Sequence, residues 1–247
     1  MTPPSELTVV GRGRVGGSLT AAAEASGLQV RDGAAAILLC VPDGAIEDAC
    51  RDLLENSRPE LVGHVSGACD LGVLSPASNA GVKTFSMHPL QTFPGPDTTV
   101  AGTPCAVAGS DEESRRFARD LATRLGMQPF EVPEESRAAY HAAASIASNF
   151  LIAIEEAAVE LLERSGIEGG RELLSPLVLR SAANWSESGA DALTGPIARG
   201  DAETIARHRE AIERVAPEIV PLYDQLADQT ERVAYGNRSE VDGRRGR

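Results

Sequence analysis

The sequence predicts an α/β domain built on a parallel sheet, followed by an all-helical domain. Over the first 132 of the 247 residues, short apolar runs alternate with helical stretches, which is the pattern of a parallel sheet covered by helices. Near the N-terminus, one apolar run passes through Gly-x-Gly-x-x-Gly directly into a helical stretch. After Pro133 the strand pattern stops, so we place the domain boundary near 132.

The elements of the first domain (1–132) follow from these apolar runs. Strands are expected at 7–10, 35–41, 60–66, 82–88, 104–109 and 128–132, with helices at 43–55 and 111–125 among the connections.

The second domain (133–235) is expected to be helical throughout. Glu134 to Ser165 contains neither Gly nor Pro, which predicts one long helix. Its centre is apolar nearly all round, which indicates a buried helix, and the polar side chains within it argue against a membrane span. Further helices are expected at 175–187 (with Ser175 and Pro176 as N-cap and first residue), 201–216 and 217–234, before a disordered polar tail at 236–247.

Composition excludes several classes of function. The net charge of −13 argues against a nucleic-acid partner, because phosphate binding needs a basic surface. The four cysteines show no C-x-x-C spacing, and no residue spacing resembles a metal site. The sequence shows no N-terminal leader and no apolar run of 18 residues, so we expect a cytoplasmic protein without a membrane partner.

Each glycine of the turn has its own physical reason. Gly11 permits a tight turn, Gly13 lets the backbone approach a pyrophosphate, and Gly16 lets the helix pack on its strand. The helix that follows would offer free amides to phosphates. The strand–turn–helix context therefore predicts dinucleotide-type geometry, and the expected cofactor-binding residues are Gly11, Gly13, Arg14, Val15, Gly16, Asp32, Val41 and Pro42.

The segment 27–42 is shorter than this type of domain requires. Asp32 lies 21 residues after Gly11, as expected for an acidic residue that holds the cofactor ribose. Yet only four residues separate Asp32 from the next apolar run, whereas neighbouring parallel strands need a crossover of about a dozen residues. Either 28–31 is not a parallel strand, or it meets its neighbour as an antiparallel hairpin. In both cases the wall around the adenosine end is curtailed.

The four histidines lie in places that suggest a site. His64 and His88 end two expected strands, where ligands bind in open parallel sheets; a structural hydrogen bond is the alternative for each. His141, Ser145 and Ser148 or Asn149 follow helical spacing and form a polar stripe, facing either a ligand or a packing partner. For His208, seven residues after an expected Asp201 cap, a core position is the favoured interpretation.

Six stretches together resemble a bacterial family with an N-terminal Rossmann-like domain and a C-terminal domain of unknown function. They are "VVGRGRVGGSL", "CVPDGAI", "HVSGA", "HPLQTF", "YHAAASIASNF" and "ALTGPIARGD". The architecture is similar to that of 6-phosphogluconate dehydrogenase, 3-hydroxyisobutyrate dehydrogenase, pyrroline-5-carboxylate reductase and ketopantoate reductase. The resemblance implies a nicotinamide cofactor (NAD or NADP) on the glycine turn, a substrate between the two domains, and a homodimer formed through the helical domain.

Two features depart from that pattern. Hydroxyacid dehydrogenases of this kind carry a lysine four residues before a helical asparagine. Asn149 matches that asparagine, but position 145 is serine, which cannot act as an ammonium. An imidazole, His88 or His141, must then supply the acid. The second departure is segment 27–42, which lacks the helix expected between the second and third strands.

The sequence thus predicts an NAD(P)-dependent oxidoreductase acting on a small carbonyl, imine or hydroxy acid. The expected catalytic residues are His88, His141 and Asn149, and the expected substrate-binding residues are His64, Ser66, Tyr140 and Ser145. The alternative is a non-catalytic ligand-binding or scaffold protein in which dinucleotide binding is weakened or lost. Segment 27–42 favours the alternative, and the histidines at strand ends favour the enzyme.

Overall fold

The structure is a computed structural model that describes the backbone of residues 5–245 and the side chains of residues 5–236. It divides into two compact units, Met1–Ser148 and Asn149–Arg247. The last strand ends at Glu131, so the first unit also contains the beginning of the helical part of the chain. Each unit is described by itself.

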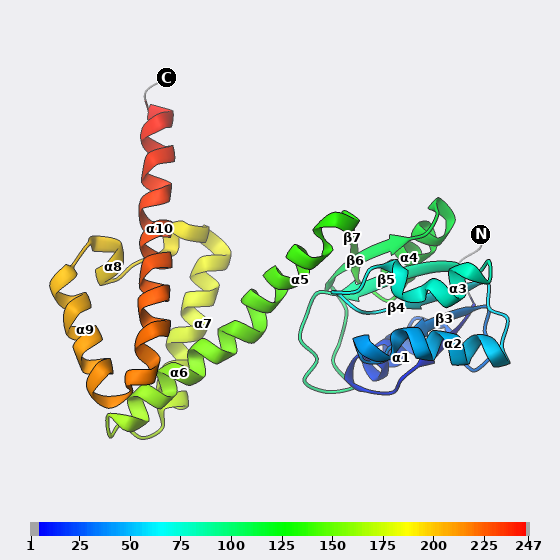
Figure 1. The fold of residues 1–247 in the computed structure, drawn as a ribbon, viewed down its shortest axis with the longest axis horizontal. Coiled ribbons are helices and arrows are strands. Elements are labelled where there is room, and N and C mark those ends of the chain that lie inside the picture. Colours follow the sequence, from blue (N-terminus) through cyan, green and yellow to red (C-terminus); the bar gives the residue numbers. More distant parts are fainter. Residues whose placement is uncertain (1–4, 246–247) are drawn as a thin grey trace. The chain divides into compact units, whose positions relative to one another are not determined.

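The first unit is built on one seven-stranded sheet with the order β2-β1-β3-β4-β5-β6-β7 (Figure 1). Neighbouring strands are parallel except β5 and β6, which are antiparallel. The strands are β1 (Glu6–Val10), β2 (Gln29–Val30), β3 (Ala36–Leu39), β4 (Leu61–His64), β5 (Lys83–Pro89), β6 (Pro104–Gly109) and β7 (Gln128–Glu131). The six strands expected from the apolar runs are confirmed to within three residues at each end.

The sheet is mostly parallel rather than parallel throughout. The connection between β5 and β6, residues 90–103, contains no helix, and β6 returns alongside β5 in the opposite direction. This connection packs on the helix that follows the glycine turn: the side chain of Ser18 donates a hydrogen bond to the carbonyl of Gly95, 3.3 Å away.

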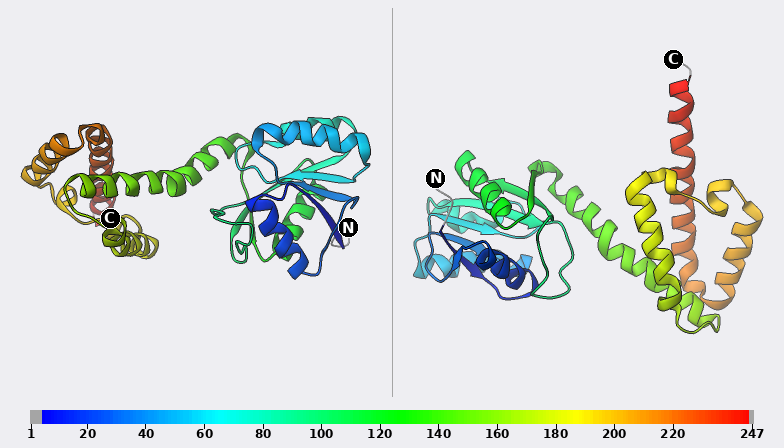
Figure 2. Two further views of the ribbon diagram at one scale, coloured as in Figure 1. Left: turned by 90° about the horizontal axis from the view of Figure 1, so that it is seen from below. Right: turned by 180° about the vertical axis from the view of Figure 1, so that it is seen from behind.

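Helices cover both faces of the sheet, as seen when the molecule is viewed from below (Figure 2). One core lies between the sheet and α1 (Arg14–Ala25) and α4 (Glu112–Arg124) and includes Leu19, Phe85 and Phe117. The other lies under α2 (Ile46–Asn56) and α3 (Ser75–Asn79). Burial on both faces explains why the strands are continuous apolar runs rather than alternating ones.

Neither arrangement expected for residues 28–31 is correct. β2 is a parallel strand, but it pairs with β1 and not with β3, so β1 lies between them. The crossover rule for neighbouring parallel strands therefore does not apply. The connection crosses β1 at Thr8, whose hydroxyl donates to the carbonyl of Arg31 (2.7 Å) and accepts from the amide of Ala34 (3.1 Å).

The short segment instead makes β2 an edge strand. In the common strand order of dinucleotide-binding domains, 3-2-1-4-5-6, a further strand lies outside the second. Here that strand and its helices are missing, and the sheet ends at a strand of two residues. In chain order α1, β2 and β3 follow one another without another helix between them. Asp32 is exposed directly after this edge.

The expected long helix is confirmed as one continuous element over Glu134–Arg164. It consists of a first 3₁₀ turn, α5 (Arg137–Ser145), a π-helical turn at Ile146–Phe150 and α6 (Leu151–Arg164). Most of it is exposed in the single chain, for example Ile146 and Ile152. By length and composition this is the one helix, among the described residues, that could cross a membrane.

The second unit continues with the helices α7 (Gly170–Ser188), α8 (Pro196–Arg199), α9 (Ala202–Val215) and α10 (Val220–Arg245). Of these, α7 and α9 pack on α6, while α10 packs on α8 and α9. The expected start of a helix at Ser175 is wrong. α7 begins five residues earlier, where Gly170 packs closely on Val159, and it carries Pro176 in its interior.

Two further expectations concern the ends of helices. Asp201 is confirmed as the N-cap of α9, since its carboxylate accepts from the amide of Thr204 at 3.1 Å. A polar tail is expected from 236, whereas α10 continues to Arg245. Residues 246 and 247 lie outside the described residues.

Candidate functional site

The glycine turn has the geometry that the sequence predicts. Gly11 has φ of +95°, and a Cβ there would lie 2.4 Å from the carbonyl oxygen of Cys40. A Cβ on Gly16 would lie 1.9 Å from the carbonyl oxygen of Gly11, so only glycine fits where the helix crosses its strand. A Cβ on Gly13 would meet nothing within 4 Å. The open side of the turn is therefore at Gly13, where a pyrophosphate would approach.

The N-terminus of α1 is free to bind an anion. Gly13 is its N-cap and makes no side-chain capping bond, and the first turn contains no acidic residue. The unpaired amides and the helix dipole favour a negative group at this position. Arg12 and Arg14 are exposed beside the turn, while Val15 packs on the core. The residues present therefore fit the diphosphate of a dinucleotide.

The turn also lies at the point where the strand order reverses. β1 has β2 on one side and β3 on the other, and ligands of open α/β sheets bind in the crevice at such a switch point. Val41 and Pro42 follow β3 closely and flank this position.

The ends of four parallel strands line up along one edge of the sheet. Val10 pairs with Leu39, Leu39 pairs with His64, and His64 pairs with Ser86. His88 stands two residues further along β5, so it lies on the same carboxyl edge as the glycine turn.

Three aromatic side chains form a cluster at the β5 end of this edge. The Nδ1 atom of His88 lies 2.8 Å from the hydroxyl of Tyr140, within hydrogen-bond distance. The ring centroids of His88 and His141 are 6.0 Å apart, nearly edge to face. Tyr140 also packs against Phe130 of β7, with ring centroids 5.9 Å apart. The structure thus brings together the two histidines that the sequence places at a strand end and on a helix.

The loop after β4 closes on this cluster. A Cβ on Gly67 would lie 2.7 Å from the Cε1 and Nε2 atoms of His88, and 2.7 Å from Cδ2 of His141. Only a residue without a side chain lets both imidazoles approach the loop so closely. The Cε1–Nε2 edge of His88 therefore lies beside Gly67, while Nδ1 lies next to the hydroxyl of Tyr140.

Burial sets the charge states of His88 and Tyr140. It lowers the pKa of His88 to about 4, with further contributions from the nearby His141 and Arg137. Burial also raises the pKa of Tyr140 to about 12. At neutral pH the imidazole of His88 is therefore uncharged and the phenol keeps its proton, so the O–H of Tyr140 can donate to Nδ1.

His64 and Ser66 are directed toward the protein. His64 is fully buried; its Nδ1 accepts from the amide of Ser66 (3.1 Å), and its Nε2 faces the carbonyl of Asp70 (3.3 Å). Burial, and next Arg137, lower the pKa of His64 to about 4. The hydroxyl of Ser66 accepts from the amides of Ala68 and Cys69. This geometry favours a shaping function for both side chains in the loop that carries Gly67.

Arg137 is a site residue that the sequence analysis misses. It begins α5 and is only 3% exposed, with one guanidinium nitrogen 2.8 Å from the hydroxyl of Ser86 and another 3.4 Å from the carbonyl of Ser66. The only available signal is its position, three and four residues before Tyr140 and His141 on the same helix. That signal does not distinguish it from an exposed arginine.

The remaining expected site residues lie further along the helix or elsewhere. Ser145 is the last residue of α5, and the π-helical turn follows it immediately, so the expected stripe does not continue with regular α-helical spacing to Asn149. Ser148 donates to the carbonyl of Ala144, 2.7 Å away. The core position favoured for His208 is wrong: it is exposed on α9 and faces the hydroxyl of Tyr223 at 3.1 Å. Among the described residues, no group of three His, Cys, Asp or Glu could hold a metal ion.

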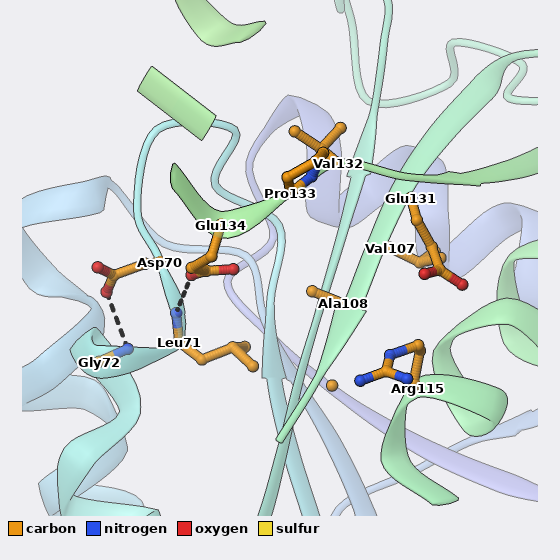
Figure 3. A pocket seen from close by; sticks show the side chains of 11 residues that line it. Asp70, Leu71, Gly72, Val107, Ala108, Arg115, Glu131, Val132, Pro133 and Glu134 are labelled. Carbon is orange, nitrogen blue, oxygen red and sulfur yellow. Dashed lines mark hydrogen bonds between the residues drawn. The ribbon is translucent and has the colours of Figure 1, made fainter. Parts of the chain in front are cut away.

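A separate pocket of about 790 Å³ lies on the first unit (Figure 3). Its lining comes from the loop at Asp70–Gly72, the end of β6, Arg115 and the segment 131–134. Its charged groups already have partners: Glu134 accepts from the amide of Leu71, and Arg115 pairs with Glu112. No expected site residue lines it, so we place the candidate site at the carboxyl edge instead.

Comparison with solved structures gives the fold. The chain matches a candidate NADP oxidoreductase from Bacteroides fragilis (TM-score 0.78, 20% identity, 93% of this chain and 99% of the other). It matches a reductive aminase from Aspergillus terreus in complex with NADPH and ethyl-5-oxohexanoate (TM-score 0.64, 14% identity, 92% of this chain and 93% of the other). It also matches 1-pyrroline-5-carboxylate reductase from Streptococcus pyogenes (TM-score 0.58, 17% identity, 93% of this chain and 97% of the other). At these identities the likeness shows a shared fold.

Family comparison defines the chain more closely. Residues 19–89 match a Rossmann-like domain. No curated protein matches the chain. Residues 103–230, which are just over half of the chain, match the domain of unknown function DUF2520. With the glycine turn, the parallel sheet and the helical second unit described above, the chain belongs to the DUF2520 family.

Proposed function

We propose that this protein is an NAD(P)-dependent oxidoreductase acting on the carbonyl, imine or hydroxy group of a small molecule. The observation that carries the proposal is the arrangement along one sheet edge. An uncapped phosphate cradle and a cluster of two imidazoles and a phenol stand on the same carboxyl edge of one compact unit. Similar folds are found in proteins described as NADP or NADPH enzymes, which supports the same cofactor class here.

The residues of the turn would hold the cofactor. Gly11, Gly13 and Gly16 with the α1 amides would bind the diphosphate, Arg14 would add positive charge, and Val15 would support the turn. Val41 and Pro42 would flank the dinucleotide, and Asp32 would reach its ribose. When bound, the cofactor supplies or accepts the hydride.

In this mechanism His88 acts as a neutral donor. The hydroxyl of Tyr140 donates a hydrogen bond to Nδ1 of His88. The proton of the neutral imidazole therefore resides on Nε2. That N–H polarises the substrate oxygen or nitrogen, as preorganised donors do where charge develops. His141, edge to face with His88, delivers the proton that the reduced product requires. Ser145 is assigned to substrate binding, and His64 and Ser66 to shaping the loop.

Thermal unfolding with added NADPH or NADH tests the proposal directly. At 10 mM cofactor and a Kd of about 1 mM, ligand binding stabilises the fold by about 1.4 kcal/mol. For a chain of this length the midpoint should rise by about 3–6 °C. Gly13→Asp places a carboxylate in the open cradle without a steric clash and should abolish the rise. Ala21→Asp adds the same charge to an exposed position of α1 and should leave it intact. No rise in the wild type contradicts the proposal.

A second candidate function has one specific observation in its favour. The two-residue edge strand β2 leaves Asp32 exposed, without the outer strand that usually supports the adenosine end. A non-catalytic protein that binds another ligand at the same edge would need no such support. Turnover with any carbonyl or imine substrate in the presence of NADPH excludes this candidate.

We also propose that a second copy of the chain covers the exposed apolar face of the helical unit. A groove of about 330 Å³ runs between α6 and α7, and its lining includes the exposed side chains of Leu151 and Ile152 from α6 and Leu179 from α7. Isolated apolar residues are normal on a surface, but a contiguous face indicates an interface. A net charge of −13 disfavours contact of this groove with an anionic lipid surface.

Light scattering at micromolar concentration tests this homodimer. The interface should bury more than about 2,000 Å² if it is obligate. Leu179→Glu places one charge from each copy in a two-fold interface and should give monomers. Arg180→Glu, at the exposed neighbouring position, is the matched control. A monomeric wild type, or co-sedimentation of the wild type with lipid vesicles, contradicts the proposal.

We further propose a cytoplasmic location. All four cysteines are free thiols, and Cys50 and Cys105 are buried without a disulfide partner. Free thiols persist in reducing compartments. Fractionation of the native host cells, with the protein found outside the cytoplasmic fraction, would contradict this assignment.

A further inference from the structure

Arg137 is buried without a close ionic partner. It is 3% exposed, although most of the helix that it begins is exposed. The nearest carboxylate oxygen, Oε2 of Glu134, lies 3.9 Å from its Nε, and within the described residues that Nε has no hydrogen-bond partner. The other carboxylate oxygen of Glu134 accepts from the amide of Leu71 (Figure 3). Burying a guanidinium is costly, so a weak ion pair does not explain its position.

The contacts of Arg137 explain its position better. Its guanidinium bridges two segments that border the histidine cluster. Ser86, at 2.8 Å, lies in β5 two residues before His88. Ser66, whose carbonyl lies 3.4 Å away, directly precedes Gly67. The planar fork of an arginine can hold two acceptors at once, and no other side chain does this with the same rigidity.

The same helix carries the other members of the cluster. Tyr140 and His141 follow Arg137 by three and four residues, so all three project from one side of the helix. Because Arg137 holds the first turn of α5 in place, it also fixes the position and orientation of the next turn, which carries Tyr140 and His141. We propose that Arg137 is the positioning residue of this site: it ties the start of α5 to the strand and loop around His88 and so maintains the hydrogen bond between Tyr140 and His88.

The positive charge of Arg137 also favours the neutral form of His88. The charged or titratable groups that act on His88 are His141 and Arg137 from the long helix and Asp43 from the turn before α2. After burial and His141, the Arg137 cation contributes to lowering the pKa of His88. Only a neutral imidazole can accept a hydrogen bond from the hydroxyl of Tyr140 at Nδ1. Position and charge thus both keep His88 in the form that donates from Nε2.

Nitrogen NMR of the histidine rings in the full-length protein tests the proposal independently of activity. In the wild type, His88 should show an unprotonated Nδ1 and a protonated Nε2 at pH 7. Arg137→Met removes the charge and the fork, so the titration midpoint of His88 should rise and the two tautomers should mix. Arg137→Lys keeps the charge but not the bridge, so the midpoint should stay low while the tautomers mix. Arg119→Met, at an exposed position of α4, is the control and should change neither.

A second variant covers failure of Arg137→Met to fold. Ser86→Ala removes the shorter of the two hydrogen bonds with a minimal change in volume, and should also mix the tautomers. An unchanged His88 spectrum in folded Arg137→Met, or in Ser86→Ala if the former does not fold, overturns the proposal.

The expected effect of Arg137 substitutions on enzyme kinetics rests on the proposed function. Once a substrate is found, kcat/KM should fall at least tenfold in Arg137→Met, while the KM for NADPH stays unchanged. Absence of any turnover would overturn the proposed function, but the NMR comparison would still decide the assignment of Arg137.

Discussion

Two regions on one edge of the sheet are constructed in different ways. At the β1 end, the glycine turn is shaped by backbone alone: Gly11 and Gly16 are fixed by contacts with neighbouring carbonyl oxygens. At the β5 end, the cluster depends on residues from three separate segments: the side chains of His88 from β5 and of Tyr140 and His141 from α5, and Gly67, without a side chain, from the loop after β4.

The two regions also differ in how they are supported. The glycine turn stands beside an edge strand of two residues, so the adenosine side of the site has little protein around it. The histidine cluster has β6 and β7 beyond β5 and the fastened start of α5 against it. Under the proposed function, this difference makes the histidine cluster a rigid chemical end and the glycine turn a weakly enclosed cofactor end, and the following predictions test each.

The largest effect is expected from His88. Replacing it by glutamine keeps a similar size but removes the imidazole that couples Tyr140 to the substrate. Turnover should fall by about 10² to 10⁴, the usual contribution of a positioned acid or donor. Steady-state kinetics with NADPH is the measurement, and His208→Gln, on exposed α9, is the control. A change of less than twofold would make His88 a structural residue.

The next effect concerns cofactor affinity at the weakly enclosed end. The missing outer strand removes hydrogen bonds and packing of about 3–4 kcal/mol, which corresponds to two to three decades in Kd. A cofactor that typically binds in the micromolar range should therefore bind this chain in the millimolar range. Titration calorimetry measures it. Binding of NADPH or NADH to the isolated protein with a low-micromolar Kd would show that the edge strand is sufficient.

Acid should destabilise the histidine end through His64. Burial, aided by Arg137, lowers the pKa of this imidazole to about 4, whereas in the unfolded chain it is about 6.5. The unfolded state therefore takes up the proton first, so the stabilisation is complete above pH 6.5 and is lost as the pH falls toward 4. The loss is about 3 kcal/mol between pH 7.5 and 4.

Denaturant unfolding of wild type and His64→Gln at both pH values isolates this contribution. The variant is less stable at pH 7.5 but should lose less stability on acidification, because groups such as Asp111 affect both proteins equally. His208→Gln should follow the wild type. Parallel pH profiles for wild type and His64→Gln would mean that His64 is not buried as a neutral ring.

Much of the β1 end could be predicted from the sequence because its interactions are local. A strand, the three residues between it and the helix, and the first turn of that helix determine the positions of Gly11, Gly13 and Gly16 without reference to distant residues. The error concerned β2: its length and apolar pattern are compatible with several pairings. Which strand becomes its neighbour depends on the whole sheet, because β1 lies between β2 and β3.

The β5 end was only partly predictable for the same reason. His88 could be placed at a strand end, and Tyr140 and His141 on a helix, but their contact depends on how the start of α5 returns to the sheet. Arg137 connects the start of α5 to the sheet through its contacts with Ser86 and Ser66, and its burial cannot be recognised from its neighbours in sequence. The π-helical turn after Ser145 likewise changed the expected spacing to Asn149, since periodicity arguments assume a regular helix.

Gly67 allows the sharpest test of the packing at the histidine end, with the smallest expected effect. A methyl group at this position would lie 2.7 Å from both the Nε2 atom of His88 and the ring of His141. The two rings can move, so we expect Gly67→Ala to fold with a loss of about 1–3 kcal/mol in stability, as for other overpacked sites.

The displaced imidazoles should lower kcat/KM about tenfold, because a shift of this size misaligns a donor without removing it. Gly44→Ala is the matched control, since a Cβ at this exposed glycine of the turn after β3 meets nothing within 4 Å. If Gly67→Ala keeps both the wild-type His88 ring signals and full activity, the close approach of the two imidazoles is not required. The chemical end of the site would then be as loosely built as the cofactor end.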